Sequence, residues 1–271
     1  MRWPSEFTEL LTNRGREILD QGLVAPQFEF DNGETPYVSL RDVVDSEQAR
    51  VCLAAFESRF AAIRPYRVDY RIPGASQARP ELDYSSSPFC ARHYQMTCPM
   101  DGYDPRYDEA GLRNSRSFFD DSGLRTFAQS DSIRRFAEKV TGYELRQREG
   151  SGILVVCYGA YDYLSPHTDV SWPFTAGWDS ENRAIAYVDF HLIFGNDAVA
   201  HQYIVMQDGA HLNKILGGPP FNGAISVYRL PLWHYSTPLV PKPGREDEAR
   251  RWILMLNYQI VGDDRPKLLC E

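Results

Sequence analysis

The stretch GILVVCYGAYDYLSPHTD, residues 152–169, joins a short apolar run to a histidine and an aspartate two positions apart. The apolar run is rich in β-branched residues and is followed by turn residues, which predicts a β-strand that ends in a turn. In an extended strand, residues i and i+2 point to the same face. His167 and Asp169 are therefore expected to present an imidazole and a carboxylate side by side.

Runs of the same kind recur through the second half of the chain and indicate that residues 143–262 are a β-structure. Each is short, apolar or alternating, and bounded by turn residues. They are YELRQRE (143–149), AIAYVDFHLIF (184–194), HQYIVMQ (201–207), GAISVYRL (223–230) and RWILMLNYQIV (251–261). Mostly antiparallel strands in this number suit a jelly roll or distorted barrel.

The first half of the chain, residues 1–142, reads as helical and rich in loops. Three helices are predicted: within residues 5–22, from a capping Ser5 to Gly22; within residues 45–65, from a capping Asp45; and within residues 130–142, ending at Gly142. Residues 66–120 are rich in Pro, Ser, Tyr and Asp and are expected to be long irregular loops. The expected class is α+β: a single domain, residues 1–271, with a double-stranded β-helix (jelly-roll, cupin-like) core packed against the N-terminal helices.

The composition excludes several classes of protein. The formal net charge of -8 argues against a nucleic-acid partner, because a phosphate-binding surface needs clustered cations. Neither a signal peptide nor an apolar stretch of membrane-spanning length is visible, so a soluble cytoplasmic protein without a membrane partner is expected. The five cysteines are scattered without a C-x-x-C pair, which favours reduced structural thiols over disulfides or a zinc ribbon. The sequence does not predict an oligomeric state.

A third metal ligand is expected from a distant strand, because three ligands on one continuous strand cannot occupy one face of an octahedron. His191 lies inside an apolar run, His201 opens a short strand, and His211 lies in what reads as a turn or loop. His234 follows NGAISVYRLPLW (222–233), so it falls at a strand end after a long crossover. His234 is the favoured third ligand and His211 its rival.

Two histidines and one carboxylate leave three positions open on an octahedral metal, which suits non-haem Fe(II) with O2 and a bidentate organic acid. A structural zinc would close its coordination shell instead. The organic acid needs a cation for its far carboxylate, and arginine binds both oxygens of a carboxylate with its planar fork. Arg250 and Arg251 open the last long strand, and because neighbouring strand residues face opposite ways, only one of them can point inward.

The segment CYGAYDYLSPHTD (157–169), then NGAISVYRLPLWHYSTPL (222–239), then a basic residue just before Trp252 together resemble the Fe(II)/2-oxoglutarate-dependent dioxygenases. The spacing is most similar to the prolyl-hydroxylase-like branch. That family shows H-x-D, a long gap, a distal histidine after a Gly-started strand, and a Lys or Arg opening the next strand. The resemblance covers roughly residues 150–260, and the ordered set is more specific than H-x-D alone.

The resemblance implies a role for each matching residue. Arg251 would bind the far carboxylate of 2-oxoglutarate, with Arg250 as its reserve, and Tyr158 would add a hydroxyl to the same co-substrate. Iron would be held by His167, Asp169 and His234. Apart from the resemblance, the position of three aromatic residues directly after the H-x-D pair suggests that they line the substrate mouth, with packing in the core or a loop as the alternative: Trp172, Phe174 and Trp178.

The activity implied is that of an oxidoreductase, a non-haem iron dioxygenase. With Fe(II), 2-oxoglutarate and O2 it would hydroxylate or otherwise oxidise an unactivated C–H bond of a small molecule, such as an amino-acid derivative or biosynthetic intermediate. Succinate and CO2 would be released. The loops expected at residues 66–120 would form a lid.

The residues also admit other interpretations. His167 and Asp169 could be a structural pair at a strand end, and His234 a buried histidine bonded to a backbone carbonyl. Arg251 could be a solvated charge at a strand edge, paired with Glu246 or Glu248. The protein would then be a jelly-roll binding protein without redox chemistry. A third alternative is an enzyme of the same fold with a different metal, such as Mn or Zn.

Overall fold

The computed structural model describes residues 2–22, 37–60, 66–72, 89–99, 109–147, 152–167, 187–208, 211–216, 222–230 and 234–262. Within these ranges, only the backbone is described for residues 66–72, 89–91, 99, 166–167, 207–208 and 211–216. In the part of the chain so described, no helix is long and apolar enough to cross a membrane.

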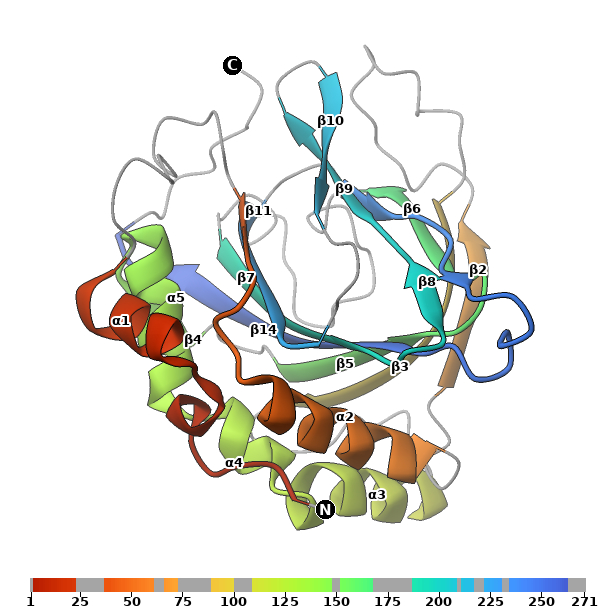
Figure 1. The fold of residues 1–271 in the computed structure, drawn as a ribbon, viewed down its shortest axis with the longest axis horizontal. Helices are drawn as coiled ribbons and strands as arrows, with labels where there is room; N and C mark the ends of the chain where they lie inside the picture. The colour runs from red at the N-terminus through yellow and green to blue at the C-terminus, as the bar shows by residue number, and fades with distance from the viewer. Residues whose placement is uncertain are drawn as a thin grey trace.

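The core is a sheet that curls around an interior, as Figure 1 shows. Eight of its strands pair in a nested order, all antiparallel: β5 with β14, β6 with β12, β7 with β11, and β9 with β10. The first strand thus pairs with the last, the second with the second to last, and so on inward, which is the rolled-up hairpin of a jelly roll. The strands are β5 (Gly152–Tyr158), β6 (Tyr163–His167), β7 (Tyr187–Gly195), β9 (Ile204–Asp208), β10 (His211–Leu216), β11 (Ala224–Leu230), β12 (His234–Ser236) and β14 (Arg251–Ile260).

These strands form two halves of one hydrogen-bonded path. One half has the order β11-β7-β14-β5 and the other β6-β12-β9-β10. Shorter strands pair at the margins: β4 (Leu145–Gln147) with β14, and β8 (Val199–His201) with β13 (Val240–Pro241). The predicted α+β class with a jelly-roll core is confirmed, and the predicted β-runs all contain strands.

The prediction of irregular loops for residues 66–120 is wrong where the structure describes them. β2 (Tyr66–Ile72) and β3 (Phe89–Pro99) are strands, and β3 joins the two halves by pairing with β5 and β6. Tyr94, Met96 and Cys98 of β3 pack in the core under the helices, while the alternate residues are polar. A strand with a polar inner face has no apolar run, which is why its sequence reads as a loop. The remaining parts of 66–120, residues 73–88 and 100–108, lie outside the described residues.

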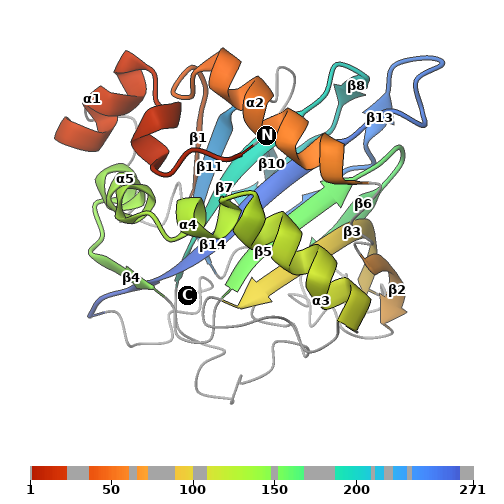
Figure 2. The same ribbon diagram turned by 90° about the horizontal axis from the view of Figure 1, so that it is seen from below.

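The N-terminal part also supplies β1 (Tyr37–Leu40), which extends the sheet beyond β11. Its helices are η1 (Phe7–Leu10), α1 (Asn13–Gln21), α2 (Ser46–Phe60), α3 (Glu109–Arg116), the π-helical turn η4 (Ser117–Asp121), α4 (Leu124–Ala128) and α5 (Asp131–Thr141). Figure 2 shows α2, α3 and α4 lying across one face of the sheet. Residues 1–142 are therefore not helices and loops alone, because they also supply strands of the sheet.

The helix ends follow from local chemistry. Asp45 Oδ1 accepts hydrogen bonds from the backbone N–H groups of the next turn at 3.0 Å, as predicted for the start of α2. α1 stops at Gly22 and α5 at Gly142, also as predicted. The expected capping role of Ser5 is wrong, because α1 begins only at Asn13, where Thr12 Oγ1 accepts from the N–H of Gly15 at 3.2 Å.

Alternate residues of the sheet strands face two different cores. The outer core lies under the helices, where Trp252 of β14 stacks on Phe56 of α2 with ring centroids 4.8 Å apart. The inner core fills the barrel and includes Val156, Ile193 and Ile253. Along β14, even-numbered residues such as Trp252 therefore face the helices, and odd-numbered residues such as Ile253 face the barrel interior.

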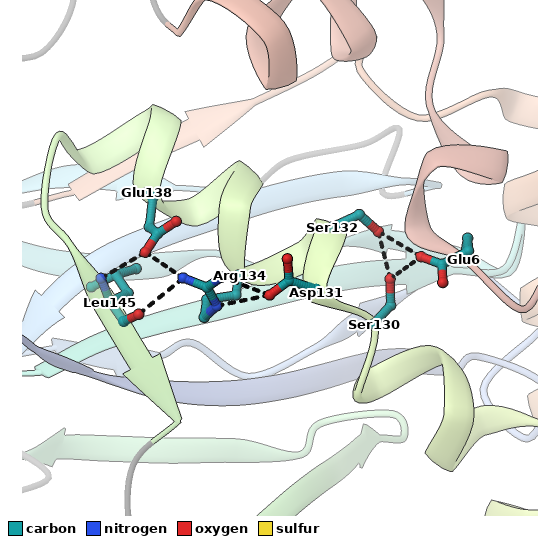
Figure 3. Close-up of polar contacts among 7 residues, drawn as sticks. All are labelled: Glu6, Ser130, Asp131, Ser132, Arg134, Glu138 and Leu145. Atoms are coloured by element: carbon teal, nitrogen blue, oxygen red, sulfur yellow. Dashed lines mark hydrogen bonds and ion pairs between the residues drawn. The ribbon is translucent and has the colours of Figure 1, made fainter.

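Polar contacts fasten α5 to its neighbours, as Figure 3 shows. Ser130 and Ser132 both donate to Glu6 Oε2, at 2.6 and 3.1 Å. At the other end, Arg134 donates to Glu138 Oε1 at 2.6 Å and to the carbonyl of Leu145 at 3.1 Å. The helix is thus linked both to the N-terminal segment and to β4.

Candidate metal and co-substrate site

The backbone brings two of the predicted metal ligands to paired positions. β6 and β12 are antiparallel neighbours, and their register places His167 directly opposite His234. Directly paired residues of antiparallel strands share a face of the sheet. The side chain of His167 and the whole of Asp169 lie outside what the structure describes.

His234 is buried and faces the barrel interior. Its ring centroid lies 5.5 Å from that of Tyr228 on β11, across the barrel. On its other side, β12 pairs with β9, where His234 is opposite Met206. Tyr228 and Met206 both belong to the inner core, so His234 is placed among interior residues.

The other histidines considered as ligands lie on three further strands, β7, β8 and β10. His201 stacks on Tyr203 with ring centroids 5.2 Å apart, and His191 is buried on the inner face of β7. His211 opens β10 and is paired with Asp208, so the expectation that it lies in a turn or loop is wrong. Among the described side chains, no group of three or more His, Cys, Asp or Glu is arranged to hold a metal ion.

Arg251 lies on the inner face of β14, at the start of the strand. It is paired with Tyr158 of β5 and Gly195 of β7, and its side chain is completely buried. Its Nη1 donates to Gln202 Oε1 at 3.0 Å, and its guanidinium carbon lies 5.8 Å from the ring centroid of Tyr158. The described contacts of this cation are thus an amide oxygen and an aromatic ring.

Gln202 is itself held in one orientation. Its amide Nε2 donates to the carbonyl of Asp162 at 3.3 Å and to that of Thr237 at 2.9 Å. Since the nitrogen must be the donor in both bonds, the oxygen is the atom that faces Arg251. The arginine is therefore positioned by backbone groups next to β6 and β12, the strands that carry the paired histidines.

Burial lowers the pKa of Arg251 to about 10, with Tyr158 and Tyr228 opposing the shift. The cause is the loss of hydration of the guanidinium charge. An anion bound beside it would offset this loss and favour the charged form. A carboxylate at this position would therefore stabilise the charged guanidinium.

Arg250 lies on the other face of the strand. Its guanidinium carbon is 5.0 Å from the ring centroid of Phe60 of α2, and its Nη1 donates to the carbonyl of Ala249 at 2.8 Å. Of the two arginines, Arg251 is the one inside the barrel. The alternative that Arg251 is a solvated edge charge is wrong, because it is buried and Glu248 instead accepts from Arg245 at 2.6 Å.

Tyr158 is buried beside Arg251, and its ring centroid lies 5.5 Å from that of His93 on β3. The sequence interpretation did not anticipate His93 and Gln202, because neither belongs to a motif. A strand assignment for β3 would have placed His93 on the inner face. The predicted substrate residues lie outside the described residues: Trp172, Phe174 and Trp178.

The described residues fit an Fe(II) site with 2-oxoglutarate as co-substrate in two respects. A pair of histidine positions meets across β6 and β12, and imidazole is a ligand that iron accepts. A buried arginine, Arg251, is linked through Gln202 to the carbonyls of Asp162 and Thr237 at the ends of the same strands, and its guanidinium can bind a carboxylate.

No protein-family model matches the sequence, and no curated protein matches it. Solved structures similar to this chain include an oxidoreductase of the 2OG-Fe(II) oxygenase family from Burkholderia pseudomallei, at 12% identity and a TM-score of 0.45, covering 90% of this chain and 98% of that chain. The non-heme alpha ketoglutarate dependent epimerase SnoN from nogalamycin biosynthesis is similar at 14% identity and a TM-score of 0.48. The match covers 91% of this chain and 83% of that chain. EctD from S. alaskensis, solved with 2-oxoglutarate and 5-hydroxyectoine, is similar at 13% identity and a TM-score of 0.47. The match covers 93% of this chain and 77% of that chain. The chain thus resembles solved 2OG-Fe(II) oxygenases.

Proposed function

We propose that this protein is an Fe(II)- and 2-oxoglutarate-dependent dioxygenase that oxidises an unactivated C–H bond of a small molecule and releases succinate and CO2. His167, Asp169 and His234 would hold the iron, and Arg251 would bind the far carboxylate of 2-oxoglutarate. The observation that carries the proposal is the register of β6 and β12, which pairs two histidine positions on strands whose ends are linked through Gln202 to a buried arginine.

The separation between these groups also supports the proposal. Gln202, which holds Arg251, is bonded to the carbonyl of Thr237. His234 lies three positions earlier in the chain, roughly 10 Å away at about 3.3 Å per residue of strand. A five-carbon dicarboxylate bound at one end to Arg251 would span much of this distance and bring its other end towards the metal ligands.

When bound, Fe(II) would supply the redox chemistry and the open coordination positions for 2-oxoglutarate and O2. The protein's own residues have different tasks. Arg251, kept in place by Gln202, orients the co-substrate by its far carboxylate. The buried ring of Tyr158, 5.8 Å from the guanidinium carbon of Arg251, would shield the guanidinium and the bound carboxylate from water, and its hydroxyl is proposed to contact the same co-substrate. Trp172, Phe174 and Trp178 are proposed to contact the substrate.

An anaerobic titration tests the proposal. The metal-free protein is titrated with Fe(II) and 2-oxoglutarate, and the weak visible charge-transfer band of the chelate is recorded. The band should require both additions and be absent from His167→Ala and His234→Ala. Succinate release would then be used to screen candidate substrates.

Two results would point to the alternatives. If the folded wild-type protein shows no band but retains affinity for a small organic ligand, it is a jelly-roll binding protein without redox chemistry. If metal analysis after anaerobic purification finds zinc or manganese and 2-oxoglutarate does not bind, the protein is an enzyme with a different metal.

A further inference from the structure

We propose that His191 and Ser226 form a subsite inside the barrel that binds a hydroxyl group of the primary substrate. The proposal deepens the proposed function, on which it rests, by assigning a chemical class: a largely apolar small molecule that carries a hydroxyl. Neither residue belongs to the metal or co-substrate set.

Both residues face the interior from neighbouring strands. His191 of β7 and Ser226 of β11 are directly paired, so their Cβ atoms are about 4.5–5.5 Å apart. Phe190 and Leu192, on either side of His191, pack in the outer core, and so do Ile225 and Val227 on either side of Ser226. The two polar side chains therefore point together towards the barrel.

A buried polar chain of contacts holds His191. Its Nε2 lies 2.9 Å from the hydroxyl of Tyr228 and 3.6 Å from Asp189 Oδ2. Asp189 in turn accepts a hydrogen bond from Asn257 Nδ2. Because Nε2 is occupied by these neighbours, the other ring nitrogen, Nδ1, is the atom available to a ligand.

Two buried polar atoms on these paired residues lack a hydrogen-bond partner among the described residues. Within the described part of the chain, His191 Nδ1 and Ser226 Oγ have no hydrogen-bond partner, although the residues are only 3% and 1% exposed. Buried polar groups are nearly always hydrogen-bonded, because an unpaired one costs desolvation free energy. Two such atoms on paired positions indicate a place where a bound molecule completes the hydrogen bonds.

The position favours the primary substrate over the co-substrate. His191 is four residues from Gly195, which is paired with Arg251, so it lies roughly 13 Å along the strand from the arginine. It is also connected through Tyr228 to His234, whose ring centroid is 5.5 Å from that of Tyr228. The subsite is therefore far from the carboxylate-binding end and close to a proposed metal ligand.

A hydroxyl is the group that satisfies both atoms. Ser226 Oγ can donate or accept, and His191 Nδ1 donates in one tautomer and accepts in the other. A hydroxyl also does both, so it fits whichever tautomer is present. On the side towards Gly195 the neighbours are apolar, since Met255 is paired with His191 and Ala224 and Ile193 occupy the next pair of inward positions. This arrangement suits an apolar body with one polar group.

The test uses two fluorinated probes that share a ring and differ by one hydroxyl, 4-fluorophenol and fluorobenzene. Their affinities for the metal-free wild-type protein are measured by fluorine NMR titration. We expect about tenfold tighter binding of 4-fluorophenol, in keeping with two neutral hydrogen bonds. Ser226→Ala and His191→Gln should each reduce this preference several-fold; glutamine can still reach Tyr228 but has no atom at the position of Nδ1.

Ser115→Ala is the matched control. Ser115 is also a buried serine whose hydroxyl has no partner among the described residues, but it lies in α3, in the helical layer. Its variant should keep the full preference for 4-fluorophenol. Equal affinity of the wild-type protein for both probes, or an unchanged preference in both Ser226→Ala and His191→Gln, would overturn the subsite.

The chelate titration separates this outcome from failure of the proposed function. A normal Fe(II)/2-oxoglutarate band without any hydroxyl preference rejects the subsite and leaves the oxygenase. A hydroxyl preference that depends on Ser226 and His191, without a chelate band, supports the subsite in a binding protein and rejects the oxygenase.

Discussion

At the scale of single residues, Arg250 and Arg251 show how one step along a strand changes a side chain's surroundings. Arg251 is enclosed in the barrel and bonded to Gln202, whereas Arg250 lies over Phe60 at the helical layer. Their charges are identical, but only the first can meet a carboxylate inside the barrel. Replacing each in turn therefore compares the same chemical change in two environments.

We predict that Arg251→Gln raises the concentration of 2-oxoglutarate needed for the chelate band at least tenfold, because charge-assisted hydrogen bonds contribute about 1.5–3 kcal/mol each. Iron binding, followed separately by metal analysis, should change little. Arg250→Gln is the control and should leave the co-substrate requirement near that of the wild-type protein. An unchanged requirement in Arg251→Gln would remove this residue from the co-substrate site.

A second residue-scale prediction concerns Gly223, which precedes β11. Its φ of +78° is unfavourable for other residues, and an added Cβ would lie 2.7 Å from the Cβ and Cγ1 of Val44. Gly223→Ala should lower the free energy of unfolding by about 2–4 kcal/mol, measured by urea denaturation. Gly244→Ala is the matched control, because Gly244 has a φ of +76° but nothing within 4 Å of the added Cβ. It should cost only about 1 kcal/mol, and equal losses in the two variants would rule out the steric explanation.

At the scale of elements, α2 is fastened to the outer face of β14 directly behind Arg251. Trp252 stacks on Phe56 and donates from Nε1 to Glu57 Oε1 at 2.9 Å. Burial raises the pKa of Glu57 above its ordinary 4.5, while the bond from Trp252 and the charge of Arg250 oppose the shift. Keeping the Glu57 carboxylate charged at the junction of α2 and the sheet therefore costs desolvation free energy.

The raised pKa of Glu57 has a definite effect on stability. The folded protein binds this proton more readily than the unfolded chain, so the contribution of Glu57 to stability is present at pH below 4.5 and is lost as the pH rises through the folded pKa. Glu57→Gln keeps an oxygen for Trp252 and removes the charge. It should stabilise the protein at pH 7, with the gain disappearing near pH 4. Urea denaturation at the two pH values measures this, and a gain that is the same at both would contradict it.

The link between the N-terminal segment and α5 is a second element-scale feature. Glu6 Oε2 accepts hydrogen bonds from both Ser130 and Ser132 (Figure 3). Glu6→Ala should reduce the free energy of unfolding by about 1–3 kcal/mol, since bonds to a charged acceptor are lost. Glu17→Ala, on the exposed side of α1, is the control and should change stability by less than about 0.5 kcal/mol. Similar values for the two variants would mean that the Glu6 contacts do not stabilise the fold.

At the scale of the whole molecule, β7 and β14 are covered on both faces. Their outward residues pack under the helices and their inward residues in the barrel, and the two strands also pair with each other. By contrast, β8 and β13 form a separate small sheet. Local stability is expected to follow this difference in burial.

Hydrogen exchange measured by mass spectrometry should therefore find the slowest amides in peptides from β7 and β14, and much faster exchange in β8 and β13. The nested pairing also places β14, the last strand of the roll, next to β5, the first. Protection of β5 should rise and fall with that of β14 under mild denaturant. Early exchange of β14 while β5 stays protected would show that the roll does not open as one unit.

Much of the fold could be read from local patterns. Apolar runs with turn residues between them predicted the strands of the second half, and the cap at Asp45 and the stop at Gly142 set helix ends. The strand β3 could not be read in this way, because one of its faces is polar and points into the barrel. The alternation along β3 is between apolar residues under the helices and polar residues in the barrel, so it indicates a strand only once the barrel interior is known to be polar there.

The sequence by itself determined the order of the candidate groups along the chain: an H-x-D pair, a distal histidine at a strand end, and an arginine at the start of the last long strand. Only the tertiary structure decided that His234 is opposite position 167 and that Arg251 is the inward arginine. The physical reason is that alternation shows which residues share a face but not which face is enclosed. Cross-strand register and the packing of Trp252 against α2 make that choice, and both depend on residues far apart in the sequence.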